Sequence, residues 1–113
     1  MAKNKTHING ELREYIGLPT NSYDIFAVVL YGSHAHDTAK ESSDIDLAVF
    51  SDNFGHNHLE EMTRLFKLRH KIDPDIEPLP FSKKDFFEHS QADFVSHILS
   101  TGKIIYREGT LYI

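Results

Sequence analysis

Two short apolar runs in the middle of the chain are typical of β-strands. Residues 25–31 (IFAVVLY) are apolar or aromatic without interruption, which predicts a strand buried on both faces of a sheet. Residues 44–50 (DIDLAVF) alternate, so that Ile45, Leu47 and Val49 share one face of a second strand and the acidic side chains share the other. This second strand therefore directs two carboxylates and an apolar triplet in opposite directions.

Helical spacing is found on either side of these two strands. Residues 11–16 provide one or two helical turns, which we expect Gly17 and Pro19 to end, so that the core begins after them. Residues 59–72 carry an apolar stripe that predicts a longer helix packed on the sheet. The stripe consists of Leu59, Met62, Leu65, Phe66 and Ile72.

Prolines mark a third strand in residues 73–81 (DPDIEPLPF). Acidic and apolar positions alternate in this stretch, but its three prolines cannot donate backbone hydrogen bonds. A strand of this composition is expected at the edge of a sheet rather than in its centre.

The last 32 residues predict two helices and a hairpin. Ser82 and Asp85 resemble a capping box, which predicts a helix that contains two phenylalanines. A further helix over residues 92–101 should end at Gly102. Residues 103–113 read as a hairpin that turns at Glu108-Gly109.

Composition and charge bound the kind of protein. With 113 residues, 40% of them apolar, the chain has room for one compact core, so we expect residues 1–113 to form a single soluble domain. A net charge of −5 opposes binding to long nucleic acid, and the absence of cysteine excludes disulfides and thiol chemistry. The first residues lack an apolar signal core, and the longest apolar run is too short to span a bilayer, so we expect no membrane association and a cytoplasmic location.

The acidic pair and a preceding Gly-Ser pair supply candidate chemistry. Asp44 and Asp46 stand at i and i+2 of a strand, so their Cα atoms lie about 6.6–6.8 Å apart and their side chains point the same way. Unpaired carboxylates this close repel each other, and Mg²⁺ is the natural neutralising partner. Gly32 allows close approach of a phosphate, to which Ser33 and the following backbone N–H groups can donate.

Other interpretations of these residues fit less well. A calcium-binding EF-hand loop that begins at Asp44 would need glycine where Val49 stands and glutamate where Gly55 stands. A Walker-type phosphate loop is excluded because the chain has no Gly-Lys-Ser/Thr. The paired histidines of the loops, such as His34 and His36, are better explained as solvent-exposed residues than as transition-metal ligands.

Gly32-Ser33, ten residues, and then Asp44-Ile45-Asp46 resembles the G-S-x10-D-x-D signature of the polymerase-beta-like nucleotidyltransferases. The small size is similar to their minimal branch, which includes antitoxin partners of helical HEPN-type toxins. The resemblance covers residues 25–81. It implies an α+β (α/β) fold with a mixed sheet and helices packed on one face. It also implies two Mg²⁺ ions and transfer of a nucleoside monophosphate, with AMP expected, from a nucleoside triphosphate to an acceptor hydroxyl, which we expect on a protein.

The resemblance also implies roles for individual residues. Gly32 and Ser33 would bind the triphosphate, while Asp44 and Asp46 would be catalytic and hold the metals. Such chemistry requires a further carboxylate on a neighbouring strand.

Asp73, Asp75 and Glu77 alternate along the third strand, and any of them could supply this carboxylate. We choose Glu77 as the third catalytic and metal-binding residue, because it lies in the middle of the strand. Asp73 and Asp75 flank Pro74 and are interpreted as the solvated start of the strand, with Asp75 left as the alternative ligand.

The chain departs from the family pattern after Gly-Ser. Where relatives often show Arg-Ala-Arg-Gly, this chain has His34-Ala35-His36-Asp37, so two permanent charges are replaced by histidines and an anion is added. The positive charge of Lys40 could compensate for these changes. A weakly active nucleotide-binding protein therefore remains an alternative to an active enzyme. Another alternative is an antitoxin-like partner of a helical HEPN-type toxin, and the late apolar helices are also compatible with self-association.

Overall fold

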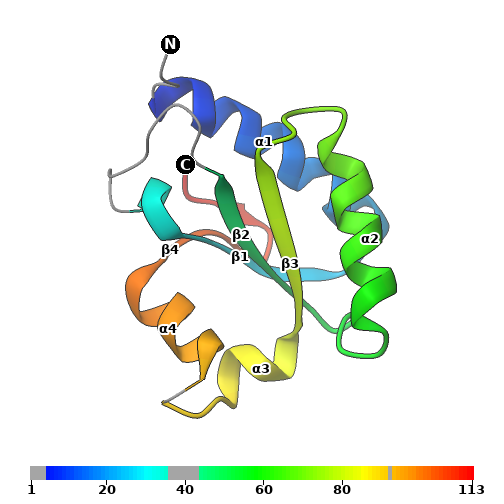
Figure 1. Cartoon of the computed structure of the whole chain (residues 1–113), viewed down its shortest axis with the longest axis vertical. Coiled ribbons are helices and arrows are strands. Elements are labelled where there is room, and N and C mark those ends of the chain that lie inside the picture. Colours follow the sequence, from blue (N-terminus) through cyan, green and yellow to red (C-terminus); the bar gives the residue numbers. More distant parts are fainter. Residues whose placement is uncertain (1–4, 36–43, 92) are drawn as a thin grey trace.

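The structure, a computed structural model, describes residues 5–35, 44–91 and 93–113. A five-stranded mixed sheet forms its centre, with the strand order β3-β2-β1-β4-β5 (Figure 1). β2 and β3 are parallel, and the other three neighbouring pairs are antiparallel. The strands are β1 (Ile25–Tyr31), β2 (Ile45–Ser51), β3 (Ile76–Ser82), β4 (Lys103–Arg107) and β5 (Thr110–Leu111).

Helices cover both faces of this sheet. The elements are α1 (Lys5–Ser22), η1, a 3-10 turn (Gly32–Ala35), α2 (His58–Arg69), α3 (Lys83–Phe87) and α4 (Phe94–Thr101). α1 and α2 contribute to one apolar cluster, and α3 and α4 pack against a second cluster on the opposite face. The predicted α+β class with a mixed sheet is confirmed. The expectation of helices on one face only is wrong, because β1 and β2 are apolar on both faces and each face needs a cover.

The predicted strands are confirmed with small changes at their ends. β1 lies in the centre of the sheet, between β2 and β4, and its residues enter the apolar clusters on both faces, which explains why they are apolar without alternation. β3 lies at the edge of the sheet and pairs only with β2. Pro78 and Pro80 are tolerated there because one side of an edge strand needs no N–H donors.

The N-terminal helix is longer than predicted. α1 runs from Lys5 to Ser22 and includes both residues that were expected to end it. Packing explains the difference: α1 buries Leu12 and Tyr15 completely, which places them in the core and not before it. Pro19 falls in the last turn, so any break that its missing N–H causes lies at the end of the helix, and the hydroxyl of Thr20 bonds to the carbonyl of Ile16 at 2.9 Å.

The apolar stripe predicted for α2 only partly matches the face of the helix that is buried. Leu65 is fully buried, and Leu68 and Ile72 pack against the same cluster, so the helix does pack on the sheet. Leu59 is 70% exposed, which corrects its place in the stripe. It lies in the first turn, where Asn57 caps the helix and the chain has just left the loop.

The later elements agree with the sequence prediction. The Ser82 hydroxyl accepts a hydrogen bond from the N–H of Asp85 at 3.2 Å and caps α3. α4 ends at Gly102, and the hairpin turns through Glu108 and Gly109, whose φ angles of 49° and 88° are both positive. No helix within the described ranges is long and apolar enough to cross a membrane.

Candidate active site

Three polar side chains form a row across one end of the sheet. Tyr31 of β1 lies opposite Asp46 of β2, and Asp46 lies beside Glu77 of β3. Because side chains alternate along a strand, residues in register on neighbouring strands project from the same face. We call Tyr31, Asp46 and Glu77 the acidic row.

The face that carries the acidic row becomes apolar two residues further along β2 and β3, and two residues earlier in the antiparallel β1. Ala48 follows Asp46 on the same face and is fully buried, and Phe50 then stacks on Phe81 with ring centroids 5.4 Å apart. Val95 and Ile98 of α4 cover this apolar part. The acidic row lies beyond their cover, and its members are only partly buried. On this face of β2, the acidic side chain therefore lies at the uncovered end and apolar side chains follow it.

Gly32 brings the backbone into close approach with the acidic row. Its φ is +74°, a backbone conformation that residues other than glycine rarely adopt, and it begins the 3-10 turn that follows β1. A Cβ atom at this position would lie 2.5 Å from Oδ2 of Asp46. Glycine is thus required here both by the backbone angle and by the carboxylate beside it.

Burial and the neighbouring carboxylates raise the proton affinity of Asp46. Burial raises the pKa of Asp46 above its ordinary value, and the charges of Glu77 and Asp44 raise it further, while His34 acts in the opposite direction. Burial and the charges of Asp46 and Glu77 raise the pKa of Tyr31 to about 12. Tyr31 therefore keeps its proton at neutral pH and can donate a hydrogen bond within the site.

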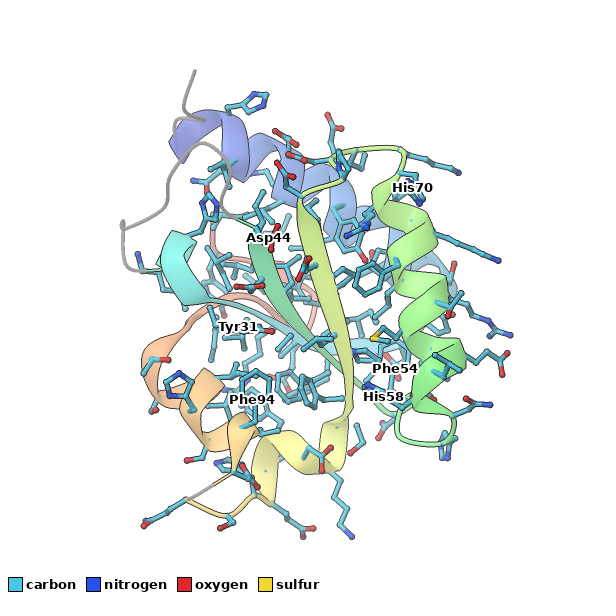
Figure 2. The ribbon with its side chains drawn as sticks, in the orientation of Figure 1. Tyr31, Asp44, Phe54, His58, His70 and Phe94 are labelled. Carbon is cyan, nitrogen blue, oxygen red and sulfur yellow. The ribbon has the colours of Figure 1, made fainter. Side chains whose placement is uncertain are left out.

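The remaining predicted site residues surround the acidic row. Asp44 is exposed and directly precedes β2, and its charge acts on Asp46. In Figure 2, Tyr31 lies between Asp44 and Phe94 on the same side of the sheet. Ser33 belongs to η1, but its side chain is outside the described part of the chain, as are residues 36–43 with His36, Asp37 and Lys40.

The three candidates for the third carboxylate occupy different places. Glu77 is the one in register with Asp46. Asp73 is 5% exposed, and one of its carboxylate oxygens accepts a hydrogen bond from the N–H of Asp75 at 2.8 Å, so its interpretation as a solvated residue is wrong. Asp75 uses its carbonyl to accept a bond from the N–H of Ile45 at the start of the β2–β3 pair. Asp73 thus shapes the turn before β3, and Glu77 stays the predicted ligand.

The acidic row suits a divalent cation by its chemistry. Among the residues that the structure describes, no three His, Asp or Glu side chains already surround a common point. Asp46, Glu77 and the neighbouring Asp44 nevertheless offer several carboxylate oxygens, the donors that Mg²⁺ prefers, and after burial the charges of Glu77 and Asp44 repel that of Asp46 and raise its pKa. A hard cation that arrives with a phosphate would relieve this repulsion.

Tyr31 is the site residue that sequence reasoning missed. The sequence shows it only as the last residue of an apolar run, and such an uninterrupted run does not reveal which residue of β2 lies opposite Tyr31. Its place before Gly32 was the available signal, because the residue before a phosphate-binding turn lies at the end of its strand.

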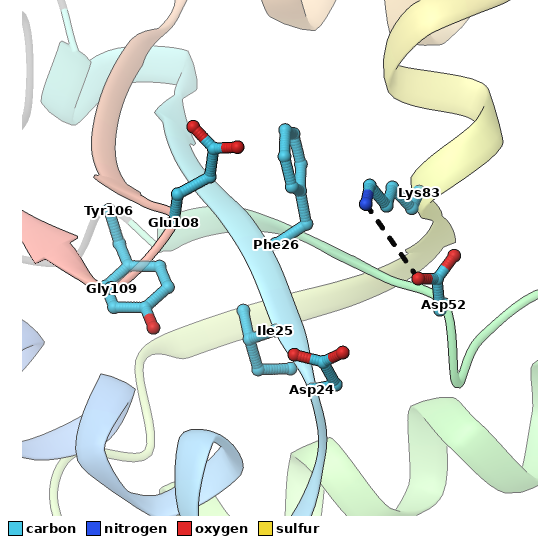
Figure 3. A pocket seen from close by; sticks show the side chains of 8 residues that line it. All are labelled: Asp24, Ile25, Phe26, Asp52, Lys83, Tyr106, Glu108 and Gly109. Carbon is cyan, nitrogen blue, oxygen red and sulfur yellow. Dashed lines mark ion pairs between the residues drawn. The ribbon is translucent and has the colours of Figure 1, made fainter.

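A cavity at the opposite end of β1 is separate from the acidic row. It has a volume of about 330 Å³ and includes Phe26, Asp52, Lys83 and Glu108 in its lining (Figure 3). The ammonium group of Lys83 lies 3.9 Å from Asp52 and 5.0 Å from the centre of the Phe26 ring. These contacts tie the start of α3 to the sheet, so we interpret them as structural.

The arrangement defines a class of protein. A mixed sheet with a glycine turn after its central strand, and carboxylates on the next two strands, is the nucleotidyltransferase-like fold. The family described as polymerase beta, nucleotidyltransferase matches residues 16–110. The chain therefore belongs to the polymerase beta nucleotidyltransferase family, and it is of the minimal type.

Individual relatives agree with this assignment. A Methanocaldococcus jannaschii protein described as a candidate protein adenylyltransferase is 33% identical over 89 residues, which cover 74% of this chain and 59% of the relative, so the chain spans about three-fifths of that protein's length. The crystal structure of a candidate nucleotidyltransferase from Sulfolobus solfataricus aligns with a TM-score of 0.67 at 15% identity, over 100% of this chain and 97% of that one. A toxin-antitoxin crystal structure with AMP-PNP aligns with a TM-score of 0.55 at 24% identity, over 96% of this chain and 75% of that chain. The two structures support the fold alone.

Proposed function

We propose that this protein is a Mg²⁺-dependent nucleotidyltransferase that transfers a nucleoside monophosphate from a nucleoside triphosphate to a hydroxyl group. We further propose that the transferred group is AMP and that the hydroxyl belongs to a protein. The description of the Methanocaldococcus jannaschii relative as a candidate protein adenylyltransferase supports both details.

The observation that carries the proposal is the position of Asp46. One of its oxygens lies 2.5 Å from the position that a Cβ on Gly32 would take, and the residue in register on its other side is Glu77. A turn that begins at glycine and two carboxylates on neighbouring strands therefore lie side by side at one end of the sheet. This is the arrangement that transfer of a phosphate-linked group requires.

Each residue has a role in the proposed reaction. Gly32 leaves room for the triphosphate, and the turn that begins there offers backbone N–H donors to it. Asp44, Asp46 and Glu77 would hold Mg²⁺, which when bound neutralises the phosphates and activates the acceptor hydroxyl. The hydroxyl oxygen bonds to the α-phosphorus, the bond from that phosphorus to the bridging oxygen breaks, and pyrophosphate leaves. The hydroxyl proton is released to a neighbouring carboxylate.

Labelled nucleotides test this proposal. The protein is incubated with Mg²⁺, candidate acceptor proteins and ATP that carries the label on either the α- or the γ-phosphate. We expect the α-label to be transferred and the γ-label to be lost, and we expect Asp44→Ala and Asp46→Ala to abolish labelling. Asp52→Ala is the matched control, because Asp52 is an exposed acid at the other end of the sheet. Transfer of the γ-label, or equal labelling by Asp46→Ala, contradicts the proposal.

An antitoxin-like partner of a helical HEPN-type toxin is the second candidate function. It is favoured by the likeness to a toxin-antitoxin structure and by two half-exposed phenylalanines on the short helices, Phe87 (58%) and Phe94 (51%). Co-expression with the product of the neighbouring gene, followed by co-purification, tests it. Recovery of the protein alone, or a neighbouring gene that encodes no helical protein, counts against it. Nucleotide binding without labelling would instead favour the weakly active nucleotide-binding protein.

A further inference from the structure

An exposed aromatic ring lies next to the acidic row. Phe94, the first residue of α4, is 51% exposed although it is large and apolar. Its ring meets that of Tyr31 edge to face, with centroids 5.8 Å apart and an interplanar angle of 86°. Tyr31 itself lies opposite Asp46 in register, so Phe94 extends the site from the carboxylates along the face of the sheet (Figure 2).

The helix holds this ring in a fixed place. Val95 and Ile98 anchor α4 in the apolar cluster, at 8% and 0% exposure. Asp93 caps the helix by accepting a hydrogen bond from the N–H of Ser96 at 3.0 Å. A second ring, that of Phe81, has its centroid 6.5 Å from that of Phe94. The exposed ring is therefore supported by a capped helix and by two aromatic neighbours, which makes it a preorganised surface.

We propose that Phe94, supported by Tyr31, is the platform on which the base of the nucleoside triphosphate stacks. In a nucleotide one ribose separates the base from the α-phosphate, so a base must rest close to the groups that hold that phosphate. Phe94 is the half-exposed ring adjacent to those groups, whereas Phe87 contacts Phe26 and Phe86 at the opposite end of the sheet. The inference rests on the proposed nucleotidyl transfer and assigns a part of the site that the carboxylates do not define.

Binding of ATP and of inorganic tripolyphosphate separates the base from the phosphates. With Mg²⁺ present, we expect calorimetry to show about 5- to 150-fold weaker binding of ATP by Phe94→Ala, the usual range for loss of one base–aromatic stack. Binding of tripolyphosphate, which has no base, should be unchanged. Phe87→Ala is the matched control, because Phe87 is also half-exposed and also contacts two rings. Phe94→Leu provides a second variant with apolar bulk if the alanine variant does not fold.

Fluorescence gives an independent readout because the chain contains no tryptophan. Phe94→Trp would place the sole indole at the proposed platform, and Phe87→Trp would place it on α3. We expect ATP, but not tripolyphosphate, to quench the emission of Phe94→Trp, and neither ligand to change that of Phe87→Trp. Equal responses to the two ligands at Phe94→Trp would overturn the inference.

The possible outcomes distinguish this inference from the function on which it rests. If the wild-type protein binds neither ATP nor tripolyphosphate, the proposed function fails and the platform fails with it. If it binds both and Phe94→Ala weakens neither, the platform alone is refuted. If Phe94→Ala keeps its ATP affinity but transfers less label, the ring contacts the acceptor, which also refutes a base platform.

Discussion

Replacing Gly32 by alanine should damage activity far more than stability. The positive φ of Gly32 costs about 1–2 kcal/mol for any residue that carries a Cβ. The added Cβ would lie 2.5 Å from Oδ2 of Asp46, about 0.9 Å short of ordinary contact, which begins near 3.4 Å. The end of a partly exposed carboxylate can move that far at little cost in folding free energy. Catalysis tolerates such a displacement poorly, because a misplacement of about 1 Å lowers rates about 100-fold.

Two other glycines separate these effects. Gly109 also has a positive φ, of 88°, but nothing lies within 4 Å of its Cβ position, so Gly109→Ala should lose the same 1–2 kcal/mol, approximately, and keep its activity. Gly10 lies inside α1 with open space around it, so Gly10→Ala should stabilise the protein by about 0.5–1 kcal/mol.

Urea denaturation and the labelling assay measure the two quantities on the same set of variants. We expect Gly32→Ala and Gly109→Ala to have similar free energies of unfolding and to differ about 100-fold in the rate of label transfer. If Gly109→Ala loses as much activity as Gly32→Ala, the loss reflects general destabilisation. If Gly32→Ala remains fully active, Asp46 does not need the position that the structure gives it, and the reasoning is refuted.

Three further changes test the charge and the packing. Without a divalent cation, Asp46→Asn should be more stable to urea than wild type at pH 7. The pKa of Asp46 is raised in the folded protein, so ionisation of this carboxyl destabilises the fold at pH 7. The carboxyl is protonated in the folded and unfolded states at low pH, so the difference between the two proteins should vanish at about pH 3. Tyr15→Phe should lose about 1 kcal/mol, because the buried Tyr15 hydroxyl donates to the Leu65 carbonyl at 2.9 Å, whereas Tyr112→Phe, at a 61% exposed residue, should not change the denaturation midpoint. Gly102→Ala should lower the free energy of unfolding by about 1–3 kcal/mol, because its Cβ would lie 2.6 Å from the Ile98 carbonyl oxygen. Its φ of −87° is ordinary, so only the contact is responsible. An unchanged denaturation midpoint would show that α4 can shift to relieve the contact.

The elements that the sequence predicts well are those whose pattern has one explanation. The unbroken apolar run of β1 requires cover on both faces of the sheet, and the prolines of β3 require an edge. The structure confirms both, since β1 contributes to the apolar clusters of both faces and β3 is an edge strand. α1 was predicted too short because Gly17 and Pro19 are local signals, whereas the burial of Leu12 and Tyr15 is a tertiary effect that outweighs them.

The candidate site shows the same division between local and tertiary information. Gly32 and Asp46 could be singled out because their spacing is a local pattern. Tyr31 could not, because its role depends on the antiparallel register that sets it opposite Asp46. Phe94 depends on a longer path still, since it follows β3 and α3 in the chain and meets Tyr31 of β1 only through the tertiary packing of α4.

The start of β2 can carry a carboxylate because α4 covers only the later residues of that strand. On one face of β2, side chains change from Asp46 to Ala48 to Phe50, that is, from charged and partly exposed to apolar and fully buried. The pairing with β1 and β3 fixes the backbone of Asp46, while α4 covers only the positions beyond it. The backbone of Asp46 is thus fixed while its carboxylate stays partly exposed. Burial and then the charges of Glu77 and Asp44 raise its pKa, and a cation–phosphate complex would neutralise those charges. A position deeper in the strand would bury the charge, and a position in the loop before it would lose the register with Glu77.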